Sequence, residues 1–240
     1  MHVGALELVV ALGAVLMGSV VQGSIGFGLN LLAAPLVAIV VPEALPTTLV
    51  LVAFPLTITT VAREHHAIDR TAVGQMLVGA VPGTIVGLFI VTRVSTSALA
   101  TLVGFVVLLG VLLSVVSPPV PVTAVTGALA GFASNIFGTA AAVGGPPVAL
   151  LFQHRDGPSA RSTLGSFFAV SASMSLIGYT IAGTIHGDQA LFALALLPAM
   201  AAGFWASKHL HVFVDGGWLR PMVLIVSGIA GCVAIARGLL

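Results

Sequence analysis

The chain consists of long apolar runs separated by short clusters of charged residues. Seven stretches of at least 16 residues contain no Asp, Glu, Lys or Arg: residues 8–42, 44–62, 71–92, 94–154, 162–187, 189–207 and 221–236. A helix needs about 20 apolar residues to cross a bilayer, and lipid admits only helices or closed barrels. The runs are continuous and lack the alternation of apolar and polar positions that barrel strands show. The pattern therefore predicts an all-α polytopic membrane protein.

Two of the apolar segments are too long for one membrane helix and too short for two. Residues 8–42 would form a helix of about 52 Å, and their middle holds the motif QGSIGFG at 22–28. The prolines at 117–121 divide the longest stretch and leave 122–154, with SNIFG at 134–138 and GGPP at 144–147. Because Gly and Pro interrupt helices, each segment is predicted to be a broken, re-entrant helical hairpin. One long tilted helix with flexible glycines is the alternative.

Weak internal repetition favours the hairpin interpretation. The matches are Gly26 with Gly138 and Pro35 with Pro147 at a shift of 112, and Pro42, Ala44 and Thr47 with Pro158, Ala160 and Thr163 at a shift of 116. Such repetition, with interrupted segments in matching positions, is typical of secondary transporters. We therefore predict two inverted structural repeats, residues 1–117 and 118–240, each a broken hairpin followed by three transmembrane helices. Together they form one integrated membrane domain.

Composition and charge exclude several classes of protein. Only 15 of 240 residues are charged, 58% are hydrophobic and the net charge is +1. A soluble domain carries roughly 25% charged residues, and a net charge this small leaves no basic face for nucleic acid. No Ser/His/Asp or HExxH arrangement indicates an enzyme. The histidine pairs at 65–66 and 209/211 lack further ligands, so we expect no metal and no cofactor.

The paired motifs at 22–28 and 134–147 resemble the signature of the TauE/SafE sulfite and organosulfonate exporter family, over essentially the whole chain. Thr47-Thr48 and Ser162-Thr163 are similar to small-hydroxyl positions of that family. The resemblance implies export of small sulfur-containing anions across a bacterial-type inner membrane. The expected partners are the anion and the lipid bilayer, and a homodimer is compatible with this interpretation. An uptake permease for a related anion, or an anion channel or uniport pore, remains an alternative, because no charged residue lies mid-span as a coupling group.

Helix N-termini at the hairpin tips suggest where the anion binds. A helix N-terminus offers free N–H donors and a partial positive charge, and the returning halves are predicted to begin near 28–30 and 146–147. Two such ends near the midplane would form a neutral anion site. The candidate residues are Gln22, Gly23, Ser24, Gly26, Gly28 and Asn30 in the first tip, and Ser134, Asn135, Gly138, Thr139, Gly144, Gly145 and Pro146 in the second. For each polar side chain, a bond within or between helices is the alternative.

The distribution of basic residues predicts an orientation. If each hairpin returns to the side it entered, Arg63, Arg70, Arg155, Arg161, Lys208 and Arg220 share one side, and Arg93 and Arg237 lie on the other. If each hairpin segment crossed the membrane once, the split would be five to three. The positive-inside rule favours the more asymmetric six-to-two split, which places the first group in the cytoplasm and both termini outside. Gly83 and Gly87, four residues apart, are predicted to serve helix packing.

Overall fold

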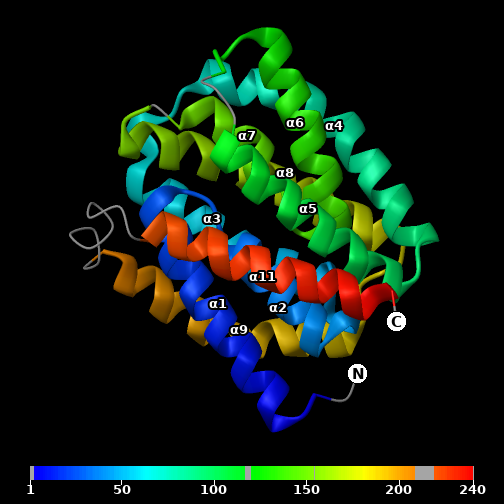
Figure 1. Ribbon diagram of the computed structural model, residues 1–240. Coiled ribbons are helices and arrows are strands. Elements are labelled where there is room, and N and C mark those ends of the chain that lie inside the picture. The colour runs from blue at the N-terminus through cyan, green and yellow to red at the C-terminus, as the bar shows by residue number, and fades with distance from the viewer. Residues whose placement is uncertain (1–2, 117–119, 154, 209–218, 240) are drawn as a thin grey trace.

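The computed structural model describes residues 3–116, 120–153, 155–208 and 219–239, and within these the chain forms only helices. They are α1 Ala5–Ile25, α2 Leu29–Val40, η1 Pro42–Ala44, α3 Thr47–Glu64, η2 His65–Ala67, α4 Arg70–Arg93, α5 Thr96–Val116, α6 Ala124–Ala141, α7 Gly145–Phe152, α8 Gly157–Ile181, α9 Gly187–Ser207 and α11 Leu219–Leu239 (Figure 1). The predicted boundary at 117/118 and the histidines at 209 and 211 lie outside the described residues.

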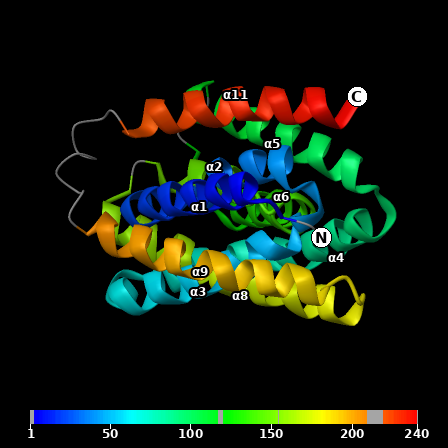
Figure 2. The ribbon, with the colours of Figure 1, turned by 90° about the horizontal axis from the view of Figure 1, so that it is seen from below.

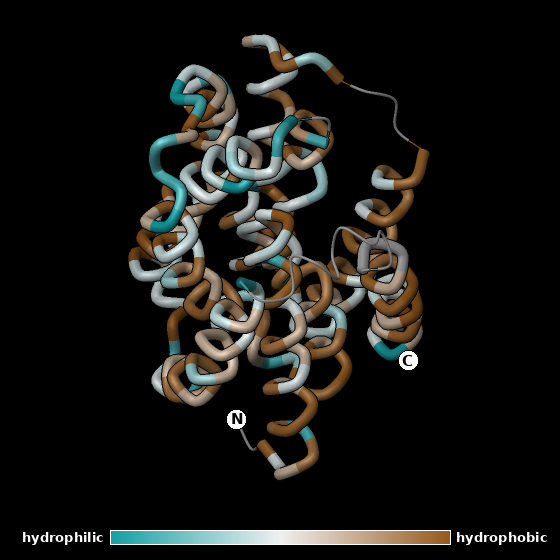
Figure 3. The backbone as a smooth tube through the Cα atoms, turned by 90° about the vertical axis from the view of Figure 1, so that its left-hand side faces the viewer, coloured by the Kyte–Doolittle hydropathy of each residue, from teal (hydrophilic) through white to brown (hydrophobic). Residues whose placement is uncertain are grey.

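The helices are long and apolar enough for a membrane protein. Seven of the described helical segments, those of α1, α3, α4, α5, α6, α8 and α9, meet the length and hydropathy expected of a span. Large apolar side chains point outward from them; Phe105 is 62% exposed and Ile181 is 81% exposed. Figure 3 shows hydrophobic residues along most of the helices. Such exposed apolar side chains can face lipid tails, which are equally apolar. Together with the seven candidate spans, they confirm the predicted class of multi-pass membrane protein.

The helices are arranged in layers, with α1 and α2 between the others. Seen from below, α5 and α11 lie on one side of α1 and α2, and α3, α8 and α9 lie on the other side (Figure 2). The most extensive contacts join α4 to α6, α5 to α11, α1 to α9 and α3 to α8. The short helix α2 is almost wholly buried between its neighbours. The returning half of the first interrupted segment therefore lies inside the bundle.

Close contacts fix the relative directions of these pairs. Gly203 of α9 faces Leu16 of α1, and Gly23 further along α1 faces Ser207 further along α9, so α1 and α9 run parallel. The pair α4 and α6 is also parallel, because its contacts advance together from Gly79 against Ala128 to Gly87 against Thr139.

The other two pairs are antiparallel. In α3 and α8, Thr60 lies against Gly165 while Glu64 pairs with Arg161. In α5 and α11, the Ser97 hydroxyl donates to the Gly238 carbonyl at 2.7 Å, and Gly104 faces Gly231. The four pairs thus combine parallel and antiparallel packing within one bundle.

Both long apolar segments are interrupted, so the single-helix alternative is wrong for the described residues. The first break contains Gly26 and Gly28, with φ of 92° and 122°. The second contains Ala142 with φ of 61°. Glycine adopts positive φ without steric cost, whereas alanine does so at a cost. A left-handed residue after α1 and after α6 ends each helix and lets the chain turn back.

The second break, residues 142–144, lies beside GGPP and not at SNIFG. SNIFG at 134–138 is part of α6, so Gly138 is helical and is not the counterpart of Gly26. Ile25 and Ala141 end α1 and α6, and Leu29 and Gly145 begin α2 and α7. A single shift of 116 therefore relates the two breaks, and the shift of 112 expected there is wrong.

The predicted packing role of Gly83 and Gly87 is confirmed. A Cβ at Gly83 would lie 2.4 Å from the Phe132 carbonyl oxygen, and one at Gly87 would lie 2.7 Å from Thr139 Cβ. Gly79, one turn earlier, is tighter still, with 1.8 Å to the Ala128 carbonyl oxygen. These glycines let the backbones of α4 and α6 approach closely, as small residues do between membrane helices.

Candidate functional site

A cavity of about 80 Å³ lies where the two breaks meet. It is bordered by α1, α2, α3, α6, α7 and α8, and it can hold a few water molecules or a small anion. Nine of the thirteen predicted site residues line this central cavity: Gln22, Gly28, Asn30, Ser134, Asn135, Gly138, Thr139, Gly144 and Gly145. The structure thus brings residues more than 100 positions apart to one place.

The N-terminus of α2 lies at the central cavity. The Gln22 side-chain oxygen accepts from the Leu29 N–H at 3.2 Å, and the Leu32 N–H bonds to the Gly28 carbonyl. The N–H groups of Asn30 and Leu31 belong to the first turn, where no intrahelical acceptor exists. Both residues line the central cavity, so two N–H groups without an intrahelical acceptor and the positive end of the α2 dipole lie beside it.

The N-terminus of α7 is poorer in donors. Gly145 is its first residue and lines the cavity, but Pro146 and Pro147 follow and carry no N–H. Proline fits the first turn of a helix because its missing N–H costs nothing there. The same property removes two donors that an anion could use. The two helix ends therefore contribute unequally, and this asymmetry was not predicted.

Three predicted polar residues of α6 are committed to bonds within the protein. The Ser134 hydroxyl donates to the Gly144 carbonyl at 2.6 Å, and the Asn135 amide donates to the Thr84 hydroxyl at 2.7 Å. The Thr139 and Ser175 hydroxyls bond each other at 2.8 Å. The alternative of interhelical bonding therefore holds for these groups, which also line the cavity.

Two polar atoms at the cavity have no partner among the described residues. Ser171 Oγ is buried without a hydrogen bond, and the residue is 8% exposed. Asn30 Oδ1 is also buried and unpartnered; rotation of its amide by 180° would present the NH₂ group instead. Buried polar groups are normally paired. These two groups therefore have hydrogen-bonding capacity that no described residue uses.

The described lining of the central cavity contains no charged residue. Apart from the groups above, it includes apolar side chains of α3 and α8, such as Val50, Ala53 and Phe168. Its electrostatic field therefore comes from helix ends and side-chain dipoles rather than from formal charges.

Four predicted site residues lie outside the central cavity. Gly23 packs against Ser207, and Gly26 against Arg161. Ser24 donates its hydroxyl to the Val20 carbonyl within α1. Pro146 packs on Gly110 of α5. These residues shape or surround the breaks, and their side-chain positions do not face the cavity.

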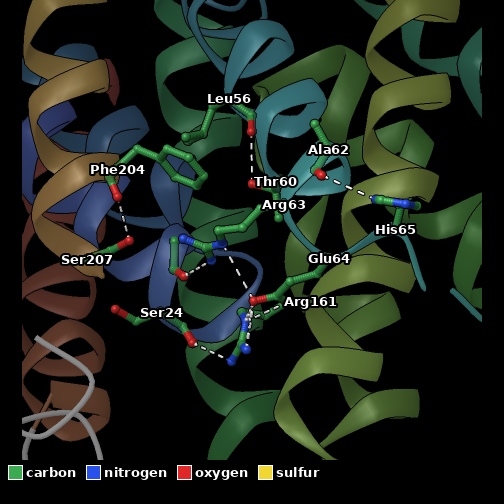
Figure 4. Close-up of polar contacts among 11 residues, drawn as sticks. Ser24, Leu56, Thr60, Ala62, Arg63, Glu64, His65, Arg161, Phe204 and Ser207 are labelled. Carbon is green, nitrogen blue, oxygen red and sulfur yellow. Dashed lines mark hydrogen bonds and ion pairs between the residues drawn. The ribbon is translucent and has the colours of Figure 1, made fainter. Parts of the chain in front are cut away.

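Charged residues gather beside the tip of the first hairpin (Figure 4). Arg161 pairs with Glu64 through two nitrogens, at 2.9–3.0 Å, and its Nη1 donates to the Ser24 carbonyl at 3.3 Å. Arg63 donates to the Gly23 carbonyl at 2.6 Å and lies over the Phe204 ring. Because these carbonyls belong to the last turn of α1, the two arginines satisfy acceptors that the helix leaves free and complement its dipole.

Sequence reasoning missed several cavity residues. Thr57, Phe168, Ser171 and Ser175 line the cavity but lie outside both motifs. Ser171 and Ser175 are four residues apart and therefore share one face of α8, which was the available signal. Among the described residues, no group of three or more His, Cys, Asp or Glu could hold a metal ion.

A family model matches most of the chain. The model of the family described as "Sulfite exporter TauE/SafE" matches residues 10–234 of the chain. No curated protein and no solved structure matches it. The match spans both breaks and every helix that borders the central cavity.

Proposed function

Because the chain belongs to the TauE/SafE family of sulfite exporters, we propose that it exports small sulfur-containing anions, such as sulfite or organosulfonates, and binds them in the central cavity. The observation that carries this proposal is the uncharged lining on which the N-terminus of α2, the N-terminus of α7 and the unpartnered Ser171 hydroxyl converge. Each hydrogen bond to a buried anion contributes about 1.5–3 kcal/mol. Three or four such bonds can replace part of the anion's hydration.

The arrangement of helices supports the proposal of two inverted repeats, residues 1–117 and 118–240. Exchanging α1–α5 with α6, α7, α8, α9 and α11 turns the α1–α9 contact into the α6–α4 contact. The pairs α3–α8 and α5–α11 exchange with themselves and are antiparallel, as inversion requires. Inverted repeats with broken helices at a shared site are the basis of alternating access in secondary transporters.

The basic residues support an orientation in the membrane. Arg63, Arg155 and Arg161 gather near the tip of α1, whereas Arg237 donates to the Ile39 carbonyl at the end where α2 finishes. The side chain of Arg220 lies outside the described residues. We propose that the end with Arg161 faces the cytoplasm of a bacterial-type inner membrane. A monovalent anion leaving an inside-negative cell gains about 2.3 kcal/mol per 100 mV, so export needs no coupling ion.

Flux measurements test this function and separate it from its rivals. The purified protein in liposomes should take up radiolabelled sulfite with saturable kinetics, and unlabelled sulfite trapped inside should accelerate uptake. Protein-free liposomes are the control. Linear flux without counter-transport would indicate a channel instead, and no flux of sulfite or any small sulfonate would refute the proposal.

A further inference from the structure

A second and larger cavity, which we call the vestibule, opens beside the central one. Its volume is about 330 Å³, and it lies between the ends of α1 and α5, the beginnings of α2, α8 and α11, and α7. Its described lining is largely apolar, and the only charged residues in it are Arg155 and Arg161. Their carboxylate partners, Asp69 and Glu64, are not part of the lining. The charged groups in the described lining of the vestibule are therefore both positive, and the carboxylates that pair with them lie outside this lining.

Both arginines have donors left for a ligand. A guanidinium carries five N–H donors, and Arg161 uses one each from Nε, Nη2 and Nη1 on Glu64 and Ser24. Its Nη1 lies beside Gly157, which lines the vestibule. Arg155 pairs with Asp69 at 3.5 Å, its guanidinium carbon lies 5.9 Å from the centre of the Phe152 ring, and its side chain is 43% exposed. An oxoanion entering the vestibule therefore meets one anchored guanidinium and one adjustable guanidinium.

A thin wall separates the vestibule from the central cavity. Phe27, Gly28 and Leu31 line both cavities. The Phe27 ring also packs against Gly145, where a Cβ would lie 3.0 Å from it. The two breaks therefore meet at this wall, and a ligand in the vestibule is one layer of residues away from the helix ends.

We propose that the vestibule is a second anion subsite, in which Arg155 and Arg161 hold a small oxoanion before it passes to the central cavity. This inference rests on the proposed transport of sulfur anions and adds a second, charged site to the neutral one. The charged site attracts the anion from water, and the neutral site accepts it once its hydration is reduced. A cleft lined by one sign of charge raises the local concentration of counter-ions in this way.

Equilibrium dialysis of radiolabelled sulfite against the purified full-length protein in neutral detergent tests the subsite. The wild-type protein should show two binding phases. Arg155→Gln should weaken one phase about 10-fold, the lower end of what such a cleft contributes, and should leave the thermal stability unchanged because the side chain is exposed. Ser171→Ala should weaken the other phase. Arg70→Gln removes the same charge beside Asp69 without touching the vestibule lining and should keep both phases.

The outcomes separate the subsite from the function. If the Arg155→Gln isotherm matches that of Arg70→Gln, the subsite is refuted while transport of sulfite still stands. If the wild-type protein neither binds nor transports sulfite or a small sulfonate, the proposed function itself fails. If Arg155→Gln instead reduces retention of phosphatidylglycerol in native mass spectrometry and leaves sulfite binding intact, the pocket takes a lipid headgroup and the proposal is wrong.

Discussion

Replacing Gly138 by valine should close the central cavity without unfolding the protein. A Cβ at Gly138 would meet only Gly144, at 3.5 Å from Cα and 3.7 Å from N, which is ordinary van der Waals contact. Gly138 lines the cavity of about 80 Å³, so the two further methyl groups would occupy space needed by the anion. With the anion bound, these methyl groups overpack the cavity, and we expect this to weaken the free energy of anion binding by about 1–3 kcal/mol. The half-saturating concentration for transport should therefore rise roughly 5- to 150-fold.

The assay is saturable uptake of sulfite in liposomes, with thermal unfolding measured in detergent. Gly74→Val is the matched control, because Gly74 is also a helical glycine and a Cβ there meets nothing within 4 Å. Both variants should unfold at similar temperatures, and only Gly138→Val should lose affinity. Normal transport by a folded Gly138→Val protein would show that the anion does not occupy this cavity.

Other substitutions should separate binding from stability. Ser171→Ala removes an unpartnered hydroxyl, so thermal stability should hold while sulfite affinity falls roughly 10-fold or more; unchanged affinity would exclude this hydroxyl from the site. Asn135→Ala, by contrast, removes the hydrogen bond to Thr84, so its free energy of unfolding should fall by about 1–2 kcal/mol in denaturation experiments. Gly26→Ala places a Cβ at a residue with positive φ, 2.8 Å from the Arg161 Cα, and should lower the free energy of unfolding by about 1–3 kcal/mol. Gly13→Ala places its Cβ in open space and should leave the free energy of unfolding almost unchanged. Equal melting temperatures for these two variants would contradict the geometry of the break.

The sequence predicted the broken helices because their cause is local. Glycines at 26 and 28 are needed where φ is positive, and a motif with three glycines in an apolar run reveals that need directly. The start of the second returning helix was predicted to within two residues, but Gly138 was wrongly matched to Gly26, because the left-handed residue of this break is Ala142, whose identity carries no such signal. Ala142 is buried in the main apolar core, and burial there depends on contacts between segments far apart in the sequence.

The candidate site was predictable only in part for the same reason. Helix N-termini follow from the breaks, so Gly28, Asn30 and Gly145 were found. Whether a polar side chain faces the cavity or bonds a neighbouring helix depends on tertiary contacts. Asn135 was predicted to bind the anion, but its amide donates to Thr84 of α4. Ser171 was not predicted as a site residue, but its hydroxyl has no hydrogen-bond partner among the described residues.

Locating a bound anion tests the central claim most directly. Selenite is a heavier analogue of sulfite, and its selenium can be located by anomalous scattering in crystals of the Cys232→Ser variant, which lacks the single thiol of the chain. We expect a peak in the central cavity with its oxygens about 3 Å from the Asn30 and Leu31 nitrogens and from Ser171 Oγ. A transport-competent protein whose peak lies anywhere except this cavity, or that shows no peak at saturating selenite, would contradict the account.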